Sequence, residues 1–472
     1  MAESELPQPP EHLSSEEFRK HGHALIDWIA DYWDRIEDLP VESSVSPGSV
    51  RDLLPPEAPQ KGEPFADLIR DLDEIVMPGI THWQHPSWFS FFPANASPPS
   101  VLAELVSAGL GVQGMLWSTS PAATEIESHV LDWLVDLMDL PSEWKTTSLG
   151  GGVLQMSASD STHTSLVVAR HQAMKRGVNP TAMVAYASTQ THSSIQKGAT
   201  VAGYRHIRLI PVDDKQAMDI SALRAALASD KAEGLVPVFV AATLGTTGTT
   251  AVDPIRPIGE ICQEENLWLH VDAAYAGNAM ICPEFRHHQD GLELVDSYTF
   301  NPHKWLMVNF DCSVFYVADR SPLIDCLSIL PPYLKNEASE SGAVIDYRDW
   351  HVPLGRRFRS LKLWWVIRSY GVEGLQSMIR YHVALTERLA EKLKSDPRFE
   401  VAAPHPFALV CFRCTAGDEA TQSLAEAVNG SPNVAWTGSE LEGRPMIRVS
   451  IGQRTTDEGH VDALWDLIDE LA

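Results

Sequence analysis

The sequence predicts an α/β protein with a mostly parallel sheet, on two observations. Short β-rich runs alternate with helical patterns from about Ser100 to Gly371, and strands that alternate with helices form parallel sheets with helices on both faces. The first hundred residues instead show helices joined by extended segments, and the last hundred mix helices with strands. We therefore expect an N-terminal helical arm over residues 1–97, a large domain over residues 98–372 and a small C-terminal α+β domain over residues 373–472.

The arm begins with a capping-box signature, Ser-Ser-Glu-Glu at residues 14–17, which predicts the start of a helix. Apolar residues then recur at helical spacing with acidic residues opposite: Leu25, Trp28, Ile29, Tyr32, Trp33 and Ile36. A proline-rich stretch precedes a second helical pattern from Phe65 to Ile75. Because the arm has little core of its own, we expect it to pack on a larger body such as a partner subunit; its acids and brief heptads disfavour a coiled coil or a membrane-surface helix.

Six short runs in the large domain are expected to be strands: Val153–Met156, Met183–Tyr186, Ile207–Ile210, Val238–Ala241, Trp268–Val271 and Ser313–Tyr316. In the small domain we expect helices over residues 375–394 and 421–428 and at the C-terminus, with strands near Leu409 and over residues 447–450. Ligands of open α/β sheets bind beyond the carboxyl ends of the strands, so we expect the chemistry there.

Charge and composition exclude several classes of function. The 472 residues include 36 basic and 63 acidic side chains, a formal charge of -27, which repels nucleic acid and anionic membranes. No apolar run approaches the roughly 20 residues of a membrane span, and the acidic, proline-rich N-terminus does not resemble a signal peptide, so we expect a cytoplasmic protein. The six cysteines are expected to be free thiols; Cys411 and Cys414 lie in a strand-like run, and no metal site is expected.

One glycine-rich segment matches a dinucleotide-binding fingerprint in the spacing of its glycines but not in the predicted structure around them. Gly109, Gly111 and Gly114 have the required spacing. A helical pattern precedes them, however, where the motif needs a strand. We therefore do not expect a dinucleotide site there.

A second segment is the better candidate for binding a phosphate. Gly150–Gly152 leads into an expected strand, and Ser157–Asp160 follows at the start of a helix running to about Lys175. Backbone N–H groups at a helix N-terminus favour an anion. A helix cap without a ligand explains Ser157 and Ser159 equally well.

Asp272 and Lys304 are the pair on which the functional prediction depends. Asp272 follows an apolar run, where a buried carboxylate needs a cationic partner, and Lys304 follows Asn301-Pro302-His303 in an apolar context that lowers the pKa of an amine. A pyridoxal phosphate enzyme needs both groups, the amine for a Schiff base and the carboxylate for the pyridinium nitrogen. The alternatives are a structural ion pair for Asp272 and a surface position for Lys304.

His192 and Thr247 follow two other expected strands. An imidazole at such a junction is suited to stacking on a cofactor ring near a substrate carboxylate, although an isolated loop histidine is more often structural. Thr246 and Thr247 are placed to support the face of the ring or its substituents.

Five motifs extend this pattern over nearly the whole chain: MPGITHW at residues 77–83, HVDAAY at 270–275, NPHKW at 301–305, VNFDC at 308–312 and PLGRRFRSLK at 353–362. With these motifs the chain resembles the group II pyridoxal-phosphate-dependent amino acid decarboxylases, most of all their aromatic-L-amino-acid decarboxylase branch. The resemblance implies the fold-type I, aspartate-aminotransferase-like architecture and pyridoxal 5'-phosphate as cofactor. It also implies a homodimer whose two active sites lie at the subunit interface.

Carried over residue by residue, the resemblance implies that Lys304 forms the Schiff base, Asp272 pairs with the ring nitrogen and His192 stacks on the ring. It places the remaining cofactor contacts at the phosphate (Ala158, Ser159, Asn301 and His303) and near the ring (Thr247 and Ala274). Tyr333 matches the tyrosine of the family's mobile catalytic loop, which is thought to donate a proton after carbon dioxide leaves. Residues 335–341 fit a closing lid.

The resemblance further implies decarboxylation of an aromatic L-amino acid (tryptophan, phenylalanine, tyrosine or dihydroxyphenylalanine) to its amine. The expected substrate-pocket residues are Trp83, Phe91, Phe92, Pro93, Gln113 and Met115. The animal enzymes have tyrosine and threonine where this chain has Phe91 and Ala94, and isoleucine and phenylalanine where it has Gln113 and Met115. These departures leave the preferred side chain open.

Other reactions remain as alternatives on the same scaffold. Aromatic aldehyde synthases couple decarboxylation to oxidative deamination, but they typically replace the histidine or loop tyrosine that this chain retains as His192 and Tyr333. A histidine decarboxylase shares most motifs, and Gln113 is able to hydrogen-bond a polar ring. An aminotransferase would need an arginine for the substrate carboxylate, and a non-catalytic scaffold would be expected to have lost Lys304 or Asp272.

Overall fold

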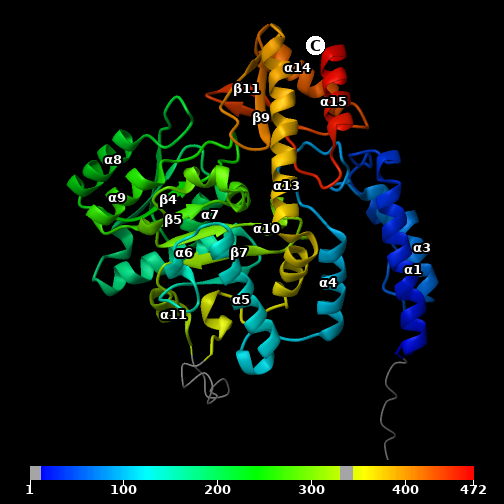
Figure 1. The fold of residues 1–472 in the computed structure, drawn as a ribbon, viewed down its shortest axis with the longest axis horizontal. Coiled ribbons are helices and arrows are strands. Elements are labelled where there is room, and N and C mark those ends of the chain that lie inside the picture. The colour runs from blue at the N-terminus through cyan, green and yellow to red at the C-terminus, as the bar shows by residue number, and fades with distance from the viewer. Residues whose placement is uncertain (1–11, 330–343) are drawn as a thin grey trace, which may run out of the picture.

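The computed structural model describes residues 12–329 and 344–472, and a seven-stranded sheet forms its centre (Figure 1). Its strand order is β1-β7-β6-β5-β4-β2-β3. The bounds are β1 Gly151–Gln155, β2 Met183–Ser188, β3 His206–Ile210, β4 Val236–Thr243, β5 Trp268–Asp272, β6 Ser297–Phe300 and β7 Ser313–Val317. Strand β7 runs antiparallel to both neighbours, and the other adjacent pairs are parallel. The predicted α/β class with a mostly parallel sheet is therefore confirmed, and so are the six predicted strands.

Helices cover both faces of this sheet: α5 Pro121–Leu137, α6 Ala158–Lys175, α7 Ser193–Val201, α8 Ile220–Ala232, α9 Ile255–Glu265 and α11 Ser321–Leu327. Strand β2 shows why, because its successive side chains enter two different cores. Val184 and Tyr186 belong to the core that includes α5, α8 and α9, whereas Met183, Ala185 and Ala187 belong to the core that includes α6 and α7. Such double burial is typical of parallel strands.

A second sheet of four antiparallel strands, in the order β10-β11-β9-β8, lies toward the C-terminus (Figure 1). Its elements are β8 Phe399–Val401, β9 Leu409–Cys414, β10 Thr437–Leu441 and β11 Arg444–Ser450, with helices α13 Ser360–Ser395, α14 Asp418–Asn429 and α15 Glu458–Leu471. Val410, Phe412, Val449 and Leu464 contribute to its own core. Helix α13 leaves helical geometry at Gly371, where φ is 67°. The predicted domain boundary after residue 372 lies beside this break and stays a prediction.

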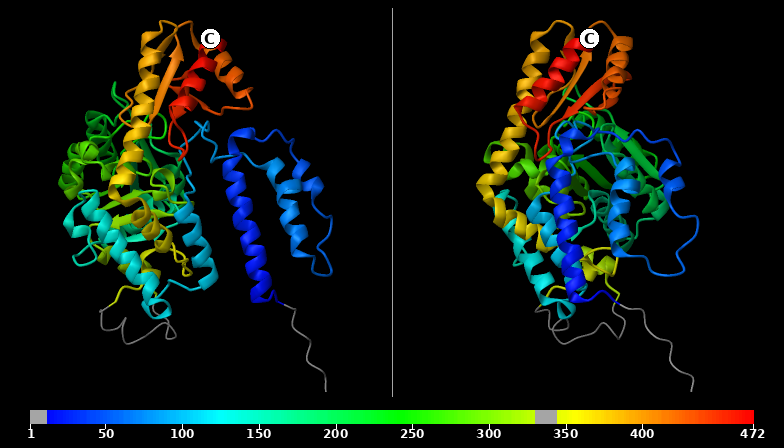
Figure 2. Two further views of the ribbon diagram at one scale, coloured as in Figure 1. Left: turned by 45° about the vertical axis from the view of Figure 1, so that its right-hand side comes forward. Right: turned by 90° about the vertical axis from the view of Figure 1, so that its right-hand side faces the viewer.

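The N-terminal arm stands beside the body of the molecule and contains α1 Ser15–Asp34, α2 Ser49–Leu53 and α3 Phe65–Asp71 (Figure 2). Ser14 caps α1 and forms the predicted capping box with Glu17. No residue of α1 is buried. The arm is tied to the body between α1 and α2, where Val41 N donates to Pro432 O at 2.7 Å. Its amphipathic helix is confirmed, and the predicted apolar residues of that helix are half-buried: Leu25, Trp28, Ile29, Tyr32 and Trp33.

Two further helices complete the described chain, α4 Pro98–Leu110 and the short α10 Pro302–Trp305. Helix α4 precedes Gly111 and Gly114, so the dinucleotide-like glycines follow a helix, as expected. Among the described residues, no helix is long and apolar enough to cross a membrane. All six cysteines are free, as predicted, and Cys411 and Cys414 lie on β9.

Candidate active site

A cavity of about 240 Å³ lies at the carboxyl ends of the central strands. It is bordered by Thr243 at the end of β4, Asp272 at the end of β5 and Asn301 directly after β6. All nine residues predicted to bind the cofactor line it: Ala158, Ser159, His192, Thr247, Asp272, Ala274, Asn301, His303 and Lys304. The fold thus brings together residues that are up to 146 positions apart (304 minus 158).

Asp272 is a buried carboxylate at the edge of this cavity, and its side chain is 4% exposed. One of its oxygens accepts a hydrogen bond from the backbone N–H of Ala274 at 3.1 Å. Among the described residues it forms no ion pair, so the structural salt bridge considered from the sequence is not found there. A buried carboxylate is costly unless a cation lies nearby. The site therefore favours a positively charged group facing Asp272.

Lys304 points its amine into the same cavity from α10, four residues after β6 ends at Phe300. Strand β6 was not among the six predicted strands, because its Ser297 and Thr299 interrupt the apolar run. The amine nitrogen lies 5.2 Å from the centroid of the Phe92 ring. Burial lowers the pKa of Lys304, and the charge of Asp272 partly opposes that shift. Lys304 is therefore not a surface lysine, and its amine is more readily neutral and nucleophilic than an ordinary lysine.

His192 caps α7 with its ring, because its Nδ1 accepts a hydrogen bond from the backbone N–H of Ser194 at 3.2 Å. His303 is held in the same way by the backbone N–H of Cys312, at 2.9 Å. In each neutral ring the proton must then lie on Nε2. Burial lowers the pKa of both, to about 3 for His303. The cavity therefore contains two neutral imidazoles of fixed tautomer.

The N-terminus of α6 forms another side of the cavity. Ser157 caps the helix, and its hydroxyl accepts a hydrogen bond from the backbone N–H of Asp160 at 3.3 Å. The backbone N–H groups of the first helical residues, Ala158 and Ser159, have no partner within the helix by geometry. This arrangement suits a phosphate group.

The glycines at residues 150–152 do not belong to this cavity, so the prediction that they cradle a phosphate is wrong. They lie at the opposite end of β1 from Ser157 and are required by packing. A Cβ atom at Gly151 would lie 2.6 Å from the Trp350 ring, and one at Gly152 would lie 2.6 Å from the Tyr316 ring. Only a residue without a side chain fits at these two positions.

A second cavity of about 370 Å³ adjoins the first and shares Lys304, His192, Thr247 and His303 with it. Four of the six residues predicted to bind substrate line it: Trp83, Phe91, Phe92 and Pro93. Ala94 and Phe310 extend the same apolar wall. The rings of Trp83 and Phe91 stack with their centroids 5.6 Å apart.

The other two predicted substrate residues lie elsewhere in this chain. Gln113 is exposed and lines neither cavity; its Oε1 accepts a hydrogen bond from the backbone N–H of Arg356 at 3.2 Å. Met115 is half-buried and also lines neither cavity. Tyr333, the predicted proton donor, lies outside the described residues.

Comparison with known proteins agrees with this geometry. The conserved domain of pyridoxal-dependent decarboxylases matches residues 47–415. The chain belongs to this family. The resemblance to the aromatic branch of the group II pyridoxal-dependent decarboxylases is likewise confirmed.

Three similar proteins illustrate the range of activities among relatives of this pyridoxal-dependent decarboxylase. Aromatic-L-amino-acid decarboxylase of Sus scrofa is 44% identical over 472 residues, covering 98% of this chain and 97% of that protein. Phenylacetaldehyde synthase of Arabidopsis thaliana is also 44% identical, over 98% of this chain and 96% of that protein. The crystal structure of Oryza sativa TDC with PLP and tryptamine is 40% identical, has a TM-score of 0.96 and covers 98% of this chain and 99% of that chain. The fold-type I architecture is therefore confirmed.

Pyridoxal 5'-phosphate is the cofactor of this decarboxylase, and the described residues fit it. Asp272 is buried and forms no ion pair within the described chain, as a partner of a protonated ring nitrogen should be. Buried oxygens of Asn301 and Thr243 line the cavity and have no hydrogen-bond partner among the residues that the structure describes. Unpaired buried polar atoms are rare in folded proteins unless a ligand meets them.

Sequence reasoning missed several residues that line the two cavities, among them Phe310 and Arg448. Phe310 lies inside the motif at residues 308–312, and its side chain is 65% exposed. Arg448 comes from β11 of the C-terminal sheet. A single arginine in the otherwise apolar strand Ile447–Val449 was the available signal, since a charge in a buried strand needs a specific reason.

Proposed function

We propose that this chain converts an aromatic L-amino acid to its amine and carbon dioxide. The observation that carries the proposal is the shared lining of the two cavities: one amine, Lys304, borders both the cofactor cavity and a wall formed by Trp83, Phe91 and Phe92. Flat aromatic side chains pack well against such a wall.

Bound pyridoxal phosphate supplies an electron-poor ring that accepts the electrons released when carbon dioxide leaves. We assign the residues of this chain to supporting roles in that chemistry. Lys304 would hold the cofactor through its amine. Asp272 would favour a proton on the ring nitrogen by its negative charge, and His192, with Nε2 carrying its proton, would lie beside the cofactor ring. The aromatic wall excludes water from the reacting carbon.

The amine is the favoured product because His192 is retained. The phenylacetaldehyde synthase relative is as similar overall as the decarboxylases, so overall identity does not decide between the two reactions. An aminotransferase is disfavoured although Arg448 lines the substrate cavity. Its guanidinium donates to the backbone carbonyls of Thr247 and Gly248 and is already engaged.

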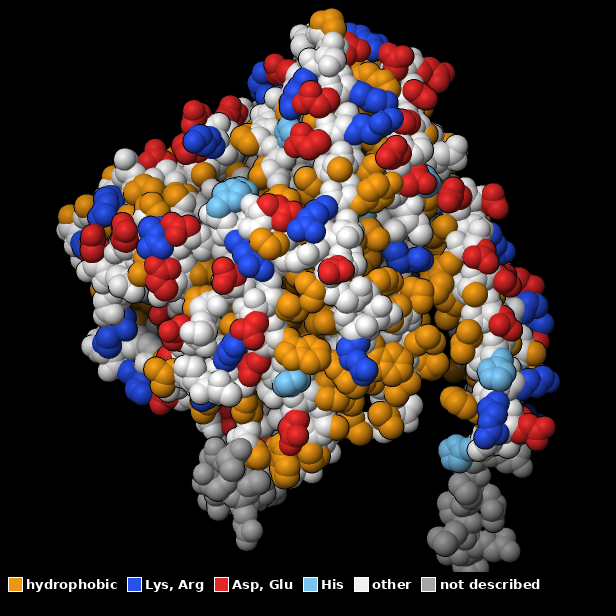
Figure 3. Space-filling view, viewed as in Figure 1, with side chains coloured by type: hydrophobic (Ala, Val, Ile, Leu, Met, Phe, Trp, Pro, Cys, Tyr) orange, Lys and Arg blue, Asp and Glu red, His pale blue; other side chains and the backbone are white. Residues whose placement is uncertain are grey.

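We also propose that the protein is a cytoplasmic homodimer. Helix α4 exposes an apolar face, with Leu102 44%, Leu105 50% and Leu110 58% exposed. Figure 3 shows hydrophobic side chains gathered over this region, facing the arm. Patches of this kind on a soluble protein usually mark an interface. Gln113 and Met115 follow α4 directly, and we assign their substrate contacts to the cavity of the second subunit.

The test is direct product analysis. Purified protein with added pyridoxal phosphate is incubated separately with L-tryptophan, L-phenylalanine, L-tyrosine, L-dihydroxyphenylalanine and L-histidine, and the products are identified by mass. An aromatic amine with an equivalent of carbon dioxide supports the proposal. An aldehyde with ammonia and peroxide would assign the chain to the aldehyde synthases, and an imidazole amine alone would make it a histidine decarboxylase.

A further inference from the structure

Arg448 is a buried arginine without a carboxylate partner among the described residues. Its side chain lies on β11, and the residue is 4% exposed. The groups that oppose the lowering of its pKa by burial are Cys411 and Tyr275, and neither is a carboxylate. Burying an unpaired guanidinium is costly, so a role that needs this cation beside the active site is expected.

The guanidinium of Arg448 holds two consecutive backbone carbonyls. Its Nε donates to Gly248 O at 3.0 Å, and one terminal nitrogen donates to Thr247 O at 2.7 Å. Thr247 borders both cavities. A planar fork with donors in fixed directions can bind both carbonyls at once, which a lysine ammonium cannot do with the same geometry.

The same guanidinium lies near the Phe92 ring, with its central carbon 5.4 Å from the ring centroid. The amine of Lys304 is 5.2 Å from that centroid. The Phe92 ring also stacks on the Tyr275 ring, with the ring centroids 3.9 Å apart and an interplanar angle of 12°. Phe92 therefore contacts a buried aromatic ring, the Arg448 guanidinium and the Lys304 amine.

We propose that Arg448 is a positioning residue that locks the Thr247–Gly248 turn and the Phe92 ring beside Lys304, so that the C-terminal sheet holds the shape of the active site. Its fixed charge has a second effect, because it adds to burial in lowering the pKa of Lys304. Arg448 thus connects β11 to the cofactor lysine by structure and by charge. The activity readout of this inference rests on the proposed function, whereas its spectroscopic readout needs only bound cofactor.

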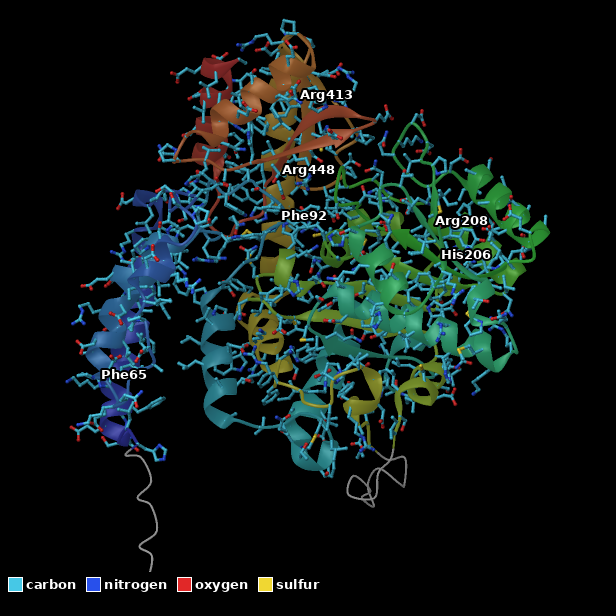
Figure 4. All side chains as sticks on the ribbon, turned by 180° about the vertical axis from the view of Figure 1, so that it is seen from behind. Phe65, Phe92, His206, Arg208, Arg413 and Arg448 are labelled. Atoms are coloured by element: carbon cyan, nitrogen blue, oxygen red, sulfur yellow. The ribbon has the colours of Figure 1, made fainter. Side chains whose placement is uncertain are left out.

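Arg413 provides a matched control in the neighbouring strand β9. It is 6% exposed, and its Nε and one terminal nitrogen donate to Pro445 O at 3.0 Å and Leu441 O at 2.7 Å. These distances equal those of Arg448, but both carbonyls belong to the C-terminal sheet and Arg413 lines neither cavity. In Figure 4, Arg448 lies between Arg413 and Phe92.

The experiment compares R448M, R448K and R413M as cofactor-loaded proteins. Three quantities are measured: the pH midpoint of the visible absorbance of cofactor bound at Lys304, kcat and KM for the aromatic amino acid that the wild type uses, and Tm. In R448M we expect the midpoint to rise by roughly half a pH unit or more, because a nearby positive charge is lost, and kcat to fall by about tenfold or more. R448K keeps the charge, so its midpoint should match the wild type while kcat falls. R413M should lower Tm and change neither the midpoint nor kcat.

The inference is overturned if R448M lowers Tm as R413M does and leaves the midpoint and kcat unchanged, since Arg448 would then be only a structural residue. It is also overturned if R448M raises KM alone, which would indicate a direct contact with the substrate carboxylate. If R448M does not fold, R448K decides, and a wild-type kcat in R448K overturns the inference. If no amino acid is turned over, the proposed function fails, and the absorbance midpoint of R448M still tests Arg448.

Discussion

Asp272 and Lys304 reach one cavity because they follow two neighbouring parallel strands. Asp272 is the last residue of β5 and is paired in register with Thr299 of β6, and Lys304 lies on the short helix that follows β6. The carboxyl ends of parallel strands lie at the same edge of a sheet. Order in the chain and strand direction together therefore place a carboxylate and an amine at the same cavity.

Replacing Asp272 with Asn should abolish most of the activity without unfolding the protein. The amide has nearly the same shape but no charge to retain a proton on the cofactor ring. We expect kcat to fall by about 10² to 10³, as for the loss of one preorganised electrostatic contact, and the absorbance spectrum of the bound cofactor to change. Steady-state kinetics and an absorbance scan measure both effects.

Asp253 supplies the control for that substitution. It is also fully buried, and its two oxygens accept hydrogen bonds from the backbone N–H groups of Met218 and Thr243, each at 2.7 Å. It does not line the cofactor cavity. Asp253→Asn should therefore lower Tm and leave the cofactor spectrum unchanged. Equal spectra for the variants at 253 and 272 would remove the assigned role of Asp272.

Replacing His192 with Asn tests the role of the imidazole in the reaction apart from its role as the N-cap of α7. Asn is a good helix N-cap, so the cap of α7 is retained while the imidazole is lost. We expect Tm to stay close to that of the wild type and kcat for amine formation to fall by roughly 10² to 10⁴, the range typical of a positioned proton-transfer group. Kinetics with product identification by mass is the measurement. A variant that keeps wild-type kcat would show that His192 is only a cap.

The sequence was sufficient to predict which residues meet in the first cavity, because these residues follow strand ends. Each of Asp272, His192 and Thr247 lies at or after the end of a strand that has a clear apolar pattern. The ends of parallel strands lie at one edge of a sheet, so the local patterns predict that these side chains lie close together. The roles that the motifs imply for them stay predictions.

The errors and omissions have a common physical cause, which is contact between distant segments. Gly151 resembles a phosphate loop until Trp350 is seen packing on it. Arg448 is 200 positions from Gly248, whose carbonyl it holds, and no local period reveals such a contact. The resemblance to the family placed Gln113 in the substrate pocket; in a single chain it lies outside the cavity, and its substrate contact stays a prediction.

Replacing Phe91 with Tyr should shift preference toward hydroxylated substrates. Phe91 is 53% exposed on the substrate wall, adopts a left-handed backbone conformation with φ 51°, and donates its backbone N–H to Thr437 Oγ1 at 3.0 Å. Tyr keeps the ring and adds one hydroxyl to an apolar wall. A single new neutral hydrogen bond corresponds to roughly a three- to tenfold change. We expect the ratio of kcat/KM for L-tyrosine to that for L-phenylalanine to rise by that factor, and an unchanged ratio would place Phe91 away from the substrate ring.

Replacing Leu105 with Glu should weaken the proposed homodimer. Leu105 is 50% exposed on the apolar face of α4, and a charge buried without a partner at an interface is strongly unfavourable. We expect a monomer, or a dimer dissociating at higher protein concentration, by light scattering coupled to size exclusion. Leu209→Glu is the control, because Leu209 is 42% exposed on the edge strand β3. A monomeric wild type, or a dimer unaffected by Leu105→Glu, would contradict this interface.

His382 makes the structure beside Lys304 sensitive to acid. Its ring is fully buried; Nδ1 accepts a hydrogen bond from the indole N–H of Trp305 at 2.9 Å, and Nε2 donates to Gln453 O at 3.1 Å. The contact with Trp305 requires the neutral ring, because a protonated Nδ1 cannot accept a hydrogen bond. Burial accordingly lowers the pKa of His382 to about 4.

Stability should therefore be lost on the acid side of neutrality. The unfolded chain binds a proton at this histidine near pH 6.5 and the folded chain only near pH 4, so the contribution is complete above pH 6.5 and is lost as the pH falls to 4. The shift corresponds to about 3 kcal/mol in the free energy of unfolding. His382→Gln replaces the ring with an amide that can also accept from Trp305 and donate to Gln453, but cannot be protonated. We expect the variant to lose less stability than the wild type between pH 7 and pH 4.5 in urea unfolding, and parallel losses in the two proteins would show that His382 is not the sensitive group.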